Sequence, residues 1–213
     1  MIRYLFFDFD GTVYDTVEGI TRCVAYAMGK MGGEAPKPSA LRCFAGPPLT
    51  EQFMLYCGYT REEAEQAVVW FRERYLPIGL YESGPFPGIG ELLSALRRGG
   101  YRMAVATSKP TELARELLER AGISEYFACV CGSDPTKPDS SKATVLSEAM
   151  AAMGAARENS LMIGDTRYDV EGAHQVGIPC VGVGWGYAAE GELEKAGADR
   201  LAATMEELKS ELL

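Results

Sequence analysis

Short apolar runs of strand length recur along the chain and alternate with segments whose apolar residues repeat every three or four positions. The near absence of charge in these runs is typical of parallel strands buried on both faces. The runs occupy residues 2–7, 102–106, 126–131, 161–163 and 180–183. The helical patterns between and after them occupy residues 88–98, 112–121, 141–153, 169–176, 190–196 and 205–212. Strands that alternate with helices predict an α/β fold, a doubly wound parallel sheet of the Rossmann-like kind.

Residues 17–81 break this alternation, because they show helical patterns and no convincing strand. Helices are predicted over residues 20–31 and 60–75, and Thr60 and Glu63 have the spacing of a capping box. Shorter helical pieces are expected around residues 41–44 and 51–56. We therefore predict an α-helical insert, residues 17–81, placed after the first strand of a core that consists of residues 1–16 and 82–213.

Carboxylate and hydroxyl side chains stand at the ends of three predicted strands. They are Asp8 and Asp10, Thr107 and Ser108, and Asp165 with Asp169 four residues later. Ligands of open parallel sheets bind beyond the carboxyl ends of the strands. Carboxylates gathered at that edge would repel one another strongly. A hard divalent cation such as Mg²⁺, which prefers carboxylate, water and phosphate oxygens, would offset the repulsion.

Asp8 and Asp10 are two residues apart, so in an extended strand their side chains point the same way. Gly11 then allows a sharp turn and a close approach to a bound phosphate. One carboxylate can attack phosphorus while the other gives a proton to the leaving oxygen and later takes one from water. Spacing alone leaves these roles exchangeable, and an ordinary Asx turn is the alternative interpretation.

A phosphate at this edge also needs hydrogen-bond donors and positive charge. Thr107 and Ser108 offer hydroxyl and main-chain N–H groups, and their alternative role is to cap the helix that follows. Lys109, Lys137 and Lys142 are the candidate cations, because phosphoryl transfer needs positive charge besides the metal. Two of these three lysines are expected to be solvated at the surface.

Two other residues have a structural and a functional interpretation. Asp169 suits either the surroundings of the metal or the first turn of a helix, where the helix dipole favours a carboxylate. His174, the single histidine, is interpreted as a surface or half-buried helix residue. Mechanisms built on a histidine pair are therefore excluded, and acid–base chemistry falls to carboxylates or lysines.

The formal net charge of −9 constrains the partners of the chain. An acidic protein repels nucleic-acid backbones, so no nucleic-acid polymer is expected to bind. The apolar runs are too short to span a membrane, and the amino terminus lacks the layout of a signal peptide, so we expect no membrane partner and a cytoplasmic location. The six cysteines have no C-x-x-C spacing, and we interpret them as buried reduced thiols and not as zinc ligands.

The segment DFDGTVYD at residues 8–15 resembles the first motif of the haloacid dehalogenase superfamily of phosphotransferases. ATSK at residues 106–109 is similar to its second motif and GDTRYD at residues 164–169 to its fourth. The resemblance implies that Asp8 is a nucleophile that forms an aspartyl-phosphate and that Asp10 is the acid/base. It implies that Asp8, the main-chain carbonyl of Asp10 and Asp165 hold Mg²⁺, with Asp169 in the layer around them. Thr107 would bind the transferring phosphoryl group.

The third motif of the family is a lysine, and two positions compete for it. Lys137, followed by a proline, has the common form but lies 28 residues before Asp165, which is longer than the usual gap. Lys142 lies 23 residues before Asp165 and resembles the form found in a phosphoglycolate-phosphatase-like branch. We choose Lys142 as the catalytic and phosphate-binding lysine and keep Lys137 as the alternative.

The helical insert resembles the family's α-helical cap of the first type, which excludes water and selects the substrate. RCFAGPPL at residues 42–49 resembles a cap segment in the branch of phosphoglycolate phosphatases and 5′-nucleotidases. Arg42, Gly46, Pro47 and, in the core, Lys109 are our candidates for substrate specificity. A plain helix-to-helix turn is the alternative for the 42–49 segment.

These features imply Mg²⁺-dependent hydrolysis of a small phosphomonoester, and thus a small phosphorylated metabolite as substrate. A mutase that moves phosphate within a sugar phosphate is the nearest alternative, since it would share the core residues. A dehalogenase needs no metal and would leave Asp10 and Asp165 without a role. Two hypotheses from different classes are a receiver-type signalling domain, which would carry its phosphoacceptor mid-chain, and a phosphate-binding protein without activity.

Overall fold

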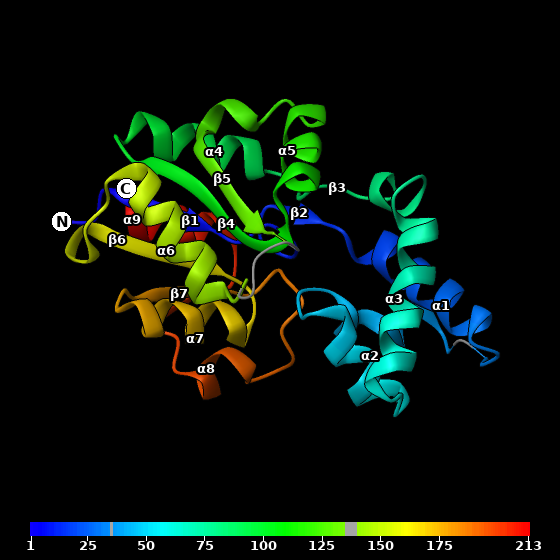
Figure 1. Cartoon of the computed structure of the whole chain (residues 1–213). Helices are drawn as coiled ribbons and strands as arrows, with labels where there is room; N and C mark the ends of the chain where they lie inside the picture. Colours follow the sequence, from blue (N-terminus) through cyan, green and yellow to red (C-terminus); the bar gives the residue numbers. More distant parts are fainter. Residues whose placement is uncertain (35, 135–139) are drawn as a thin grey trace. The chain divides into compact units, whose positions relative to one another are not determined.

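The computed structural model describes residues 1–34, 36–134 and 140–213. The chain forms two compact units: residues 1–14 with 85–213, called the core below, and residues 15–84, called the insert. The insert predicted from sequence, residues 17–81, starts two residues later and ends three residues earlier than this unit. Figure 1 labels the elements of both units and colours them along the chain.

A six-stranded sheet in the order β5-β4-β1-β6-β7-β8 runs through the core, and each neighbouring pair is parallel. β1 lies between β4 and β6, so the first strand of the chain occupies the middle of the sheet. This arrangement confirms the predicted α/β class. The strands are β1 (Tyr4–Phe7), β4 (Arg102–Pro110), β5 (Phe127–Ser133), β6 (Ser160–Gly164), β7 (Cys180–Val183) and β8 (Arg200–Ala202).

Helices flank this sheet, and α6 and α7 lie on the opposite side from α4 and α5 (Figure 1). Alternate strand residues point to opposite faces. Phe6, Ala104 and Met162 accordingly pack with Leu146 of α6 and Val170 of α7 in one buried cluster. The core helices are α4 (Ile89–Arg98), α5 (Thr111–Arg120), α6 (Lys142–Met153), α7 (Arg167–Val176), α8 (Glu192–Ala196) and α9 (Met205–Leu212), with the 3-10 helices η3 (Ser124–Tyr126) and η4 (Arg157–Asn159).

Two strands differ from the prediction. β8 was not predicted, because it has only three residues and two of them, Arg200 and Leu201, are exposed, so it carries no buried apolar run. β4 continues to Pro110, four residues beyond the predicted end at residue 106. Thr107 therefore lies within a strand, and the residue that precedes α5 is Pro110. The interpretation of Thr107 and Ser108 as caps of this helix is wrong.

The insert consists of helices packed on apolar and aromatic side chains. Thr60 and Glu63 form the predicted capping box at the start of α3. Phe44 and Phe53 are buried, with ring centroids 5.0 Å apart. The two-residue strands β2 (Tyr14–Asp15) and β3 (Gly84–Pro85) mark the points where the chain passes between the units. The other elements are α1 (Val17–Lys30), η1 (Pro38–Phe44), α2 (Leu49–Cys57), α3 (Arg61–Tyr75) and η2 (Gly79–Tyr81).

The cysteines are free thiols, but they are not uniformly buried. Cys23 and Cys180 are buried, whereas Cys43 is exposed and the other three are half-buried. The prediction of a buried thiol is wrong for Cys43, because η1 turns Leu41 and Phe44 inward instead. His174 is exposed on α7, with its Nε2 2.9 Å from Asp199 Oδ2, as expected of a surface helix residue. Within the described ranges, no helix combines the length and apolarity that a membrane crossing requires.

Candidate active site

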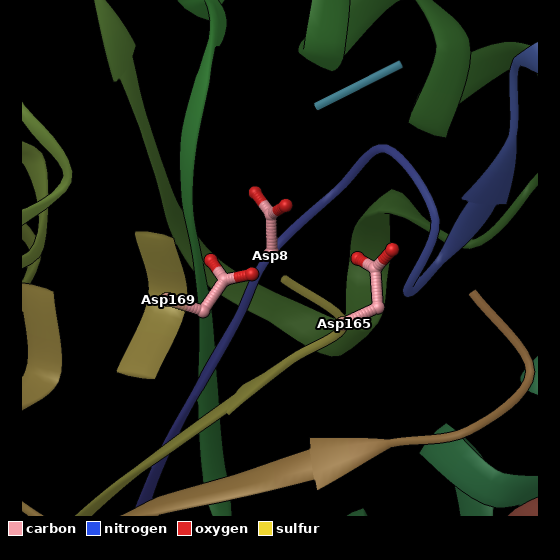
Figure 2. A group of neighbouring side chains, drawn as sticks. All are labelled: Asp8, Asp165 and Asp169. Atoms are coloured by element: carbon pink, nitrogen blue, oxygen red, sulfur yellow. The ribbon is translucent and has the colours of Figure 1, made fainter. Parts of the chain in front are cut away.

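Three buried carboxylates meet at the carboxyl ends of β1 and β6. Phe7 pairs with Ile163, and the Asp8 N–H donates to the Ile163 carbonyl at 2.9 Å, so Asp8 and Asp165 leave neighbouring strands side by side. Asp169 reaches the same place from the first turn of α7. One oxygen from each of Asp8, Asp165 and Asp169 lies within 4.8 Å of the others. Figure 2 shows Asp8 between the other two side chains.

Lys142 places a buried positive charge on this carboxylate cluster. Its Nζ lies 2.6 Å from Asp8 Oδ1 and 2.8 Å from Asp169 Oδ1, and it also donates to the Ala106 carbonyl at 3.2 Å. Asp169 Oδ1 accepts no well-aligned hydrogen bond among the described residues, so its attraction to Lys142 is mainly one of charge. Lys137, the alternative third-motif lysine, lies outside the described residues.

Burial shapes the ionisation of the carboxylate cluster. Burial and, after it, the charge of Asp169 raise the pKa of Asp8 to about 7, although Lys142 acts in the opposite direction. Burial, Asp169 and Asp8 raise the pKa of Asp165 well above its usual value. Burial disfavours the charged form of Lys142, but Asp169 and Asp8 outweigh this effect and raise its pKa. The carboxylates therefore repel one another even with Lys142 beside them.

This donor set fits a divalent cation. Three ionised carboxylates and one ammonium leave two negative charges in a buried site, and oxygen ligands are those that Mg²⁺ and similar hard cations prefer. The side chain of Asp10 is not part of the cluster. Its main-chain carbonyl, the group that the family resemblance assigns to the metal, remains the only Asp10 atom proposed as a ligand.

Two segments of the chain, one after β1 and one after β7, hold the Asp165 carboxylate in place. The Thr12 hydroxyl donates to Oδ1 at 2.9 Å, and the Tyr187 N–H donates to Oδ2 at 2.8 Å. Gly11 has φ +88°, and a Cβ at this residue would lie 2.1 Å from Asp165 Oδ2. Gly11, expected to approach a phosphate, thus approaches Asp165. Tyr187 was missed from sequence, because its contact uses a main-chain N–H that any residue provides.

Asp169 makes contacts of two kinds, one within its own helix and one with the carboxylate cluster. In the first turn of α7, its Oδ2 accepts from the Thr166 N–H at 3.0 Å and from the Thr166 hydroxyl at 2.9 Å. Its other oxygen faces Lys142. The helix cap therefore fixes the orientation in which Asp169 meets the cluster.

Lys109 is buried and paired with Asp10. Its Nζ lies 3.0 Å from Asp10 Oδ1 and 3.3 Å from Oδ2, and its side chain is only 5% exposed. Two of the three candidate lysines were expected at the surface, and this expectation is wrong for Lys109, because β4 extends far enough to carry it into the site. Its direct partner is Asp10, whereas its predicted role was in substrate specificity.

Thr107 completes the edge of the site on β4. It is 1% exposed, and its hydroxyl oxygen accepts from the Lys109 N–H at 3.1 Å. Ser108 is half-buried. Arg42, Gly46 and Pro47 belong to the insert, where Arg42 is exposed and Gly46 has φ +104°. These three residues stay predictions for substrate specificity.

Comparisons with known proteins identify a family and several similar proteins. The family model described as haloacid dehalogenase-like hydrolase matches residues 5–183. A protein named 5′-nucleotidase from Pseudomonas aeruginosa is 40% identical over 90% of this chain and 88% of its own. A protein named tyrosine-protein kinase PtkA from Mycobacterium tuberculosis is 36% identical over 99% of this chain and 72% of its own. A crystal structure described as a predicted phosphatase from Clostridium acetobutylicum superposes with a TM-score of 0.95, at 35% identity, over 100% of this chain and 98% of its own.

Proposed function

Since this chain belongs to the haloacid dehalogenase-like hydrolase family and is a phosphatase of that family, we propose that it hydrolyses a small phosphomonoester with Mg²⁺ through an aspartyl-phosphate on Asp8. The observation that carries this proposal is the buried cluster of Asp8, Asp165 and Asp169 around Lys142. A buried charged cluster costs stability, so its presence at a ligand-binding edge favours a catalytic purpose.

We assign the cation to Asp8, Asp165 and the main-chain carbonyl of Asp10. When bound, Mg²⁺ would supply positive charge that stabilises the phosphoryl group during transfer. Asp169 lies close enough to contribute an oxygen. Its ion pair with Lys142 and its cap contacts with Thr166 favour a supporting role instead.

In the proposed reaction, an Asp8 oxygen attacks phosphorus and the bond from phosphorus to the leaving oxygen breaks. Asp10 gives its proton to that oxygen, which releases the alcohol. The Asp10 carboxylate then takes a proton from water, and the resulting hydroxide oxygen attacks the aspartyl-phosphate. The bond between Asp8 and phosphorus breaks, inorganic phosphate leaves and both aspartates return to their starting forms.

Lys142 and Thr107 support these steps. Lys142 contacts Asp8 at 2.6 Å and offsets charge as the phosphoryl group arrives. The buried Thr107 hydroxyl would bind a phosphoryl oxygen. We propose that the insert acts as a cap that selects the substrate, with Arg42, Gly46 and Pro47 as its specificity residues.

A panel of phosphomonoesters assayed with purified protein and Mg²⁺ tests the proposal. Phosphoglycolate and nucleoside 5′-monophosphates belong in the panel, the latter because a relative is named 5′-nucleotidase. We expect release of inorganic phosphate that stops when EDTA is added. Isomerised sugar phosphate without phosphate release would indicate the mutase. Turnover that survives chelation would contradict the proposed mechanism.

The name of the relative called tyrosine-protein kinase suggests a second candidate activity for this chain, transfer of phosphate from ATP to tyrosine. Incubation with γ-labelled ATP and a tyrosine peptide distinguishes it. Label on the peptide would indicate a kinase, whereas an unlabelled peptide together with phosphate release from the monoester panel would indicate the proposed hydrolysis.

A further inference from the structure

The segment that follows β7 wraps around the carboxylate of Asp165. The Tyr187 N–H donates to Asp165 Oδ2 at 2.8 Å. A Cβ on Gly186 would lie 2.2 Å from the Asp165 Cβ, so only glycine allows this segment to pass so close. Trp185 stands directly before these two residues, and the catalytic steps proposed above leave it without a role.

Trp185 is connected to the opposite oxygen of Asp165 through Thr12. Its indole N–H donates to the Thr12 carbonyl at 3.1 Å. The Thr12 hydroxyl in turn donates to Asp165 Oδ1 at 2.9 Å, and Thr12 is fully buried. Residues 185–187 and the loop after β1 thus fix both oxygens of one carboxylate.

We propose that Trp185 is a positioning residue for the cation site, whose indole N–H fixes the main chain of Thr12 and so keeps the Thr12 hydroxyl on Asp165. The inference rests on the proposed function in one respect, that Asp165 holds the cation. Hydrogen bonds to a metal-binding carboxylate orient it, and their loss weakens metal affinity by about 10- to 100-fold. The free energy of cation binding should therefore depend on an indole that does not touch the cation.

The surroundings of Trp185 allow a substitution that removes its hydrogen bond but keeps an aromatic ring in its place. Trp185 is half-buried and borders an open pocket of about 440 Å³, lined also by Phe86, Leu92 and Met205. A residue beside an open pocket has room on that side, so we expect a smaller aromatic ring to be tolerated there. Trp185→Phe removes the N–H and keeps an apolar ring in the same place.

The test is a double-mutant cycle on the full chain, with Mg²⁺ affinity measured by calorimetry without substrate. We expect Trp185→Phe to weaken Mg²⁺ binding about 10-fold and Thr12→Val by at least as much. The double variant should bind no more weakly than Thr12→Val alone, because Trp185 acts through Thr12. Trp70→Phe, which changes the other tryptophan and lies in the insert, should leave the affinity unchanged.

A second readout uses tryptophan emission. In the Trp70→Phe background Trp185 is the single tryptophan, and its emission should change as Mg²⁺ is added. The additional substitution Thr12→Val should reduce this change.

The results of these measurements distinguish a failure of the positioning role of Trp185 from a failure of the proposed phosphatase function. Unchanged Mg²⁺ affinity in Trp185→Phe, or effects of the two substitutions that add fully, would overturn the role of Trp185 while leaving the phosphatase mechanism intact. A wild-type protein that binds Mg²⁺ but releases no phosphate from any monoester would overturn the proposed function and leave the positioning role standing. Absence of Mg²⁺ binding to the wild type would overturn both.

Discussion

The core and the insert place their charged residues differently. In the core, Lys142, Asp8 and Asp169 form ion pairs whose side chains are 6%, 6% and 0% exposed. In the insert, the Arg61–Glu65 and Lys30–Glu73 pairs lie at the surface. Buried ion pairs carry a desolvation cost, whereas exposed pairs contribute little either way. We therefore attribute the buried ion pairs of the core to the proposed catalysis, whereas the fold of the insert depends on its apolar packing.

One group of charged residues in the insert is intermediate in burial between these two kinds of ion pair. Arg74 contacts Glu82 through both terminal nitrogens at 2.7 and 3.0 Å, and Arg22 contacts the same carboxylate at 2.7 Å. The Arg74 and Glu82 side chains are about one-fifth exposed. Both oxygens of Glu82 accept hydrogen bonds from arginine nitrogens, so we interpret this group as structural, in contrast to the carboxylate cluster proposed for catalysis.

The largest expected effect belongs to the nucleophile. Asp8→Asn should lower the rate of phosphate release by about 10⁴-fold or more, because an amide does not form the aspartyl-phosphate. The melting temperature of the variant should stay close to that of the wild type, because the substitution removes a buried charge without changing the volume of the side chain. Glu65→Gln in the insert is the control, with an unchanged rate. A residual Asp8→Asn rate within 10-fold of wild type would mean that another residue attacks phosphorus.

Removing the buried lysine should affect both activity and stability. Lys142→Met leaves Asp8 and Asp169 without their cation, so we expect a loss of about 3–5 kcal/mol in the free energy of unfolding, measured with urea in EDTA. Phosphate release should fall by about 10²-fold or more. Lys30→Met, at an exposed pair of the insert, should change the free energy of unfolding far less than Lys142→Met does. An equal loss of unfolding free energy in Lys142→Met and Lys30→Met would mean that the buried ion pairs of the core and the exposed pair of the insert contribute alike.

The pH dependence of stability should have opposite signs in the two units. The pKa of Asp8 is raised from 3.8 to about 7, so the folded core holds a proton that the unfolded chain has lost. The stability that this proton provides is present at low pH and is lost as the pH rises towards 7. Hydrogen bonding to Arg74 lowers the pKa of Glu82, so its contribution is instead lost as the pH falls below the usual range of a glutamate.

Urea unfolding in EDTA between about pH 5 and 8 isolates the first effect, because Glu82 stays ionised throughout this range. Stability should fall as the pH rises, and Asp8→Asn should reduce the slope. Mg²⁺ should restore stability most at the upper end, since it binds the ionised carboxylates. A slope unchanged in Asp8→Asn would show that Asp8 does not hold this proton.

The smallest expected effects lie in the insert. Arg74→Met should cost about 1–2 kcal/mol, because it leaves the half-buried Glu82 with one partner fewer. Arg61→Ala at the exposed pair should cost less than about 0.5 kcal/mol. Neither substitution should alter Mg²⁺ affinity measured by calorimetry. A weaker affinity in Arg74→Met would mean that the core site depends on the insert's charges.

Much of the core could be predicted because it depends on local pattern. The five apolar runs became five strands of the sheet, and the helix at residues 205–212 was predicted with the bounds that it has. β8 escaped prediction because an exposed strand of three residues has no buried run to recognise. The position of Lys109 was also misjudged, since the extension of β4 to Pro110 depends on pairing with β5 as far as Ser133.

The sequence by itself determined the α/β class and the set of chemical groups at the strand ends, because both follow from periodicity and from residues next to one another in the chain. Only the tertiary structure decided the partners. Lys142 meets Asp8 across 134 residues, Lys109 meets Asp10 across 99, and Trp185 meets Thr12 across 173. Such contacts depend on how strands are ordered in the sheet and on which way buried side chains turn, and spacing along the chain carries neither.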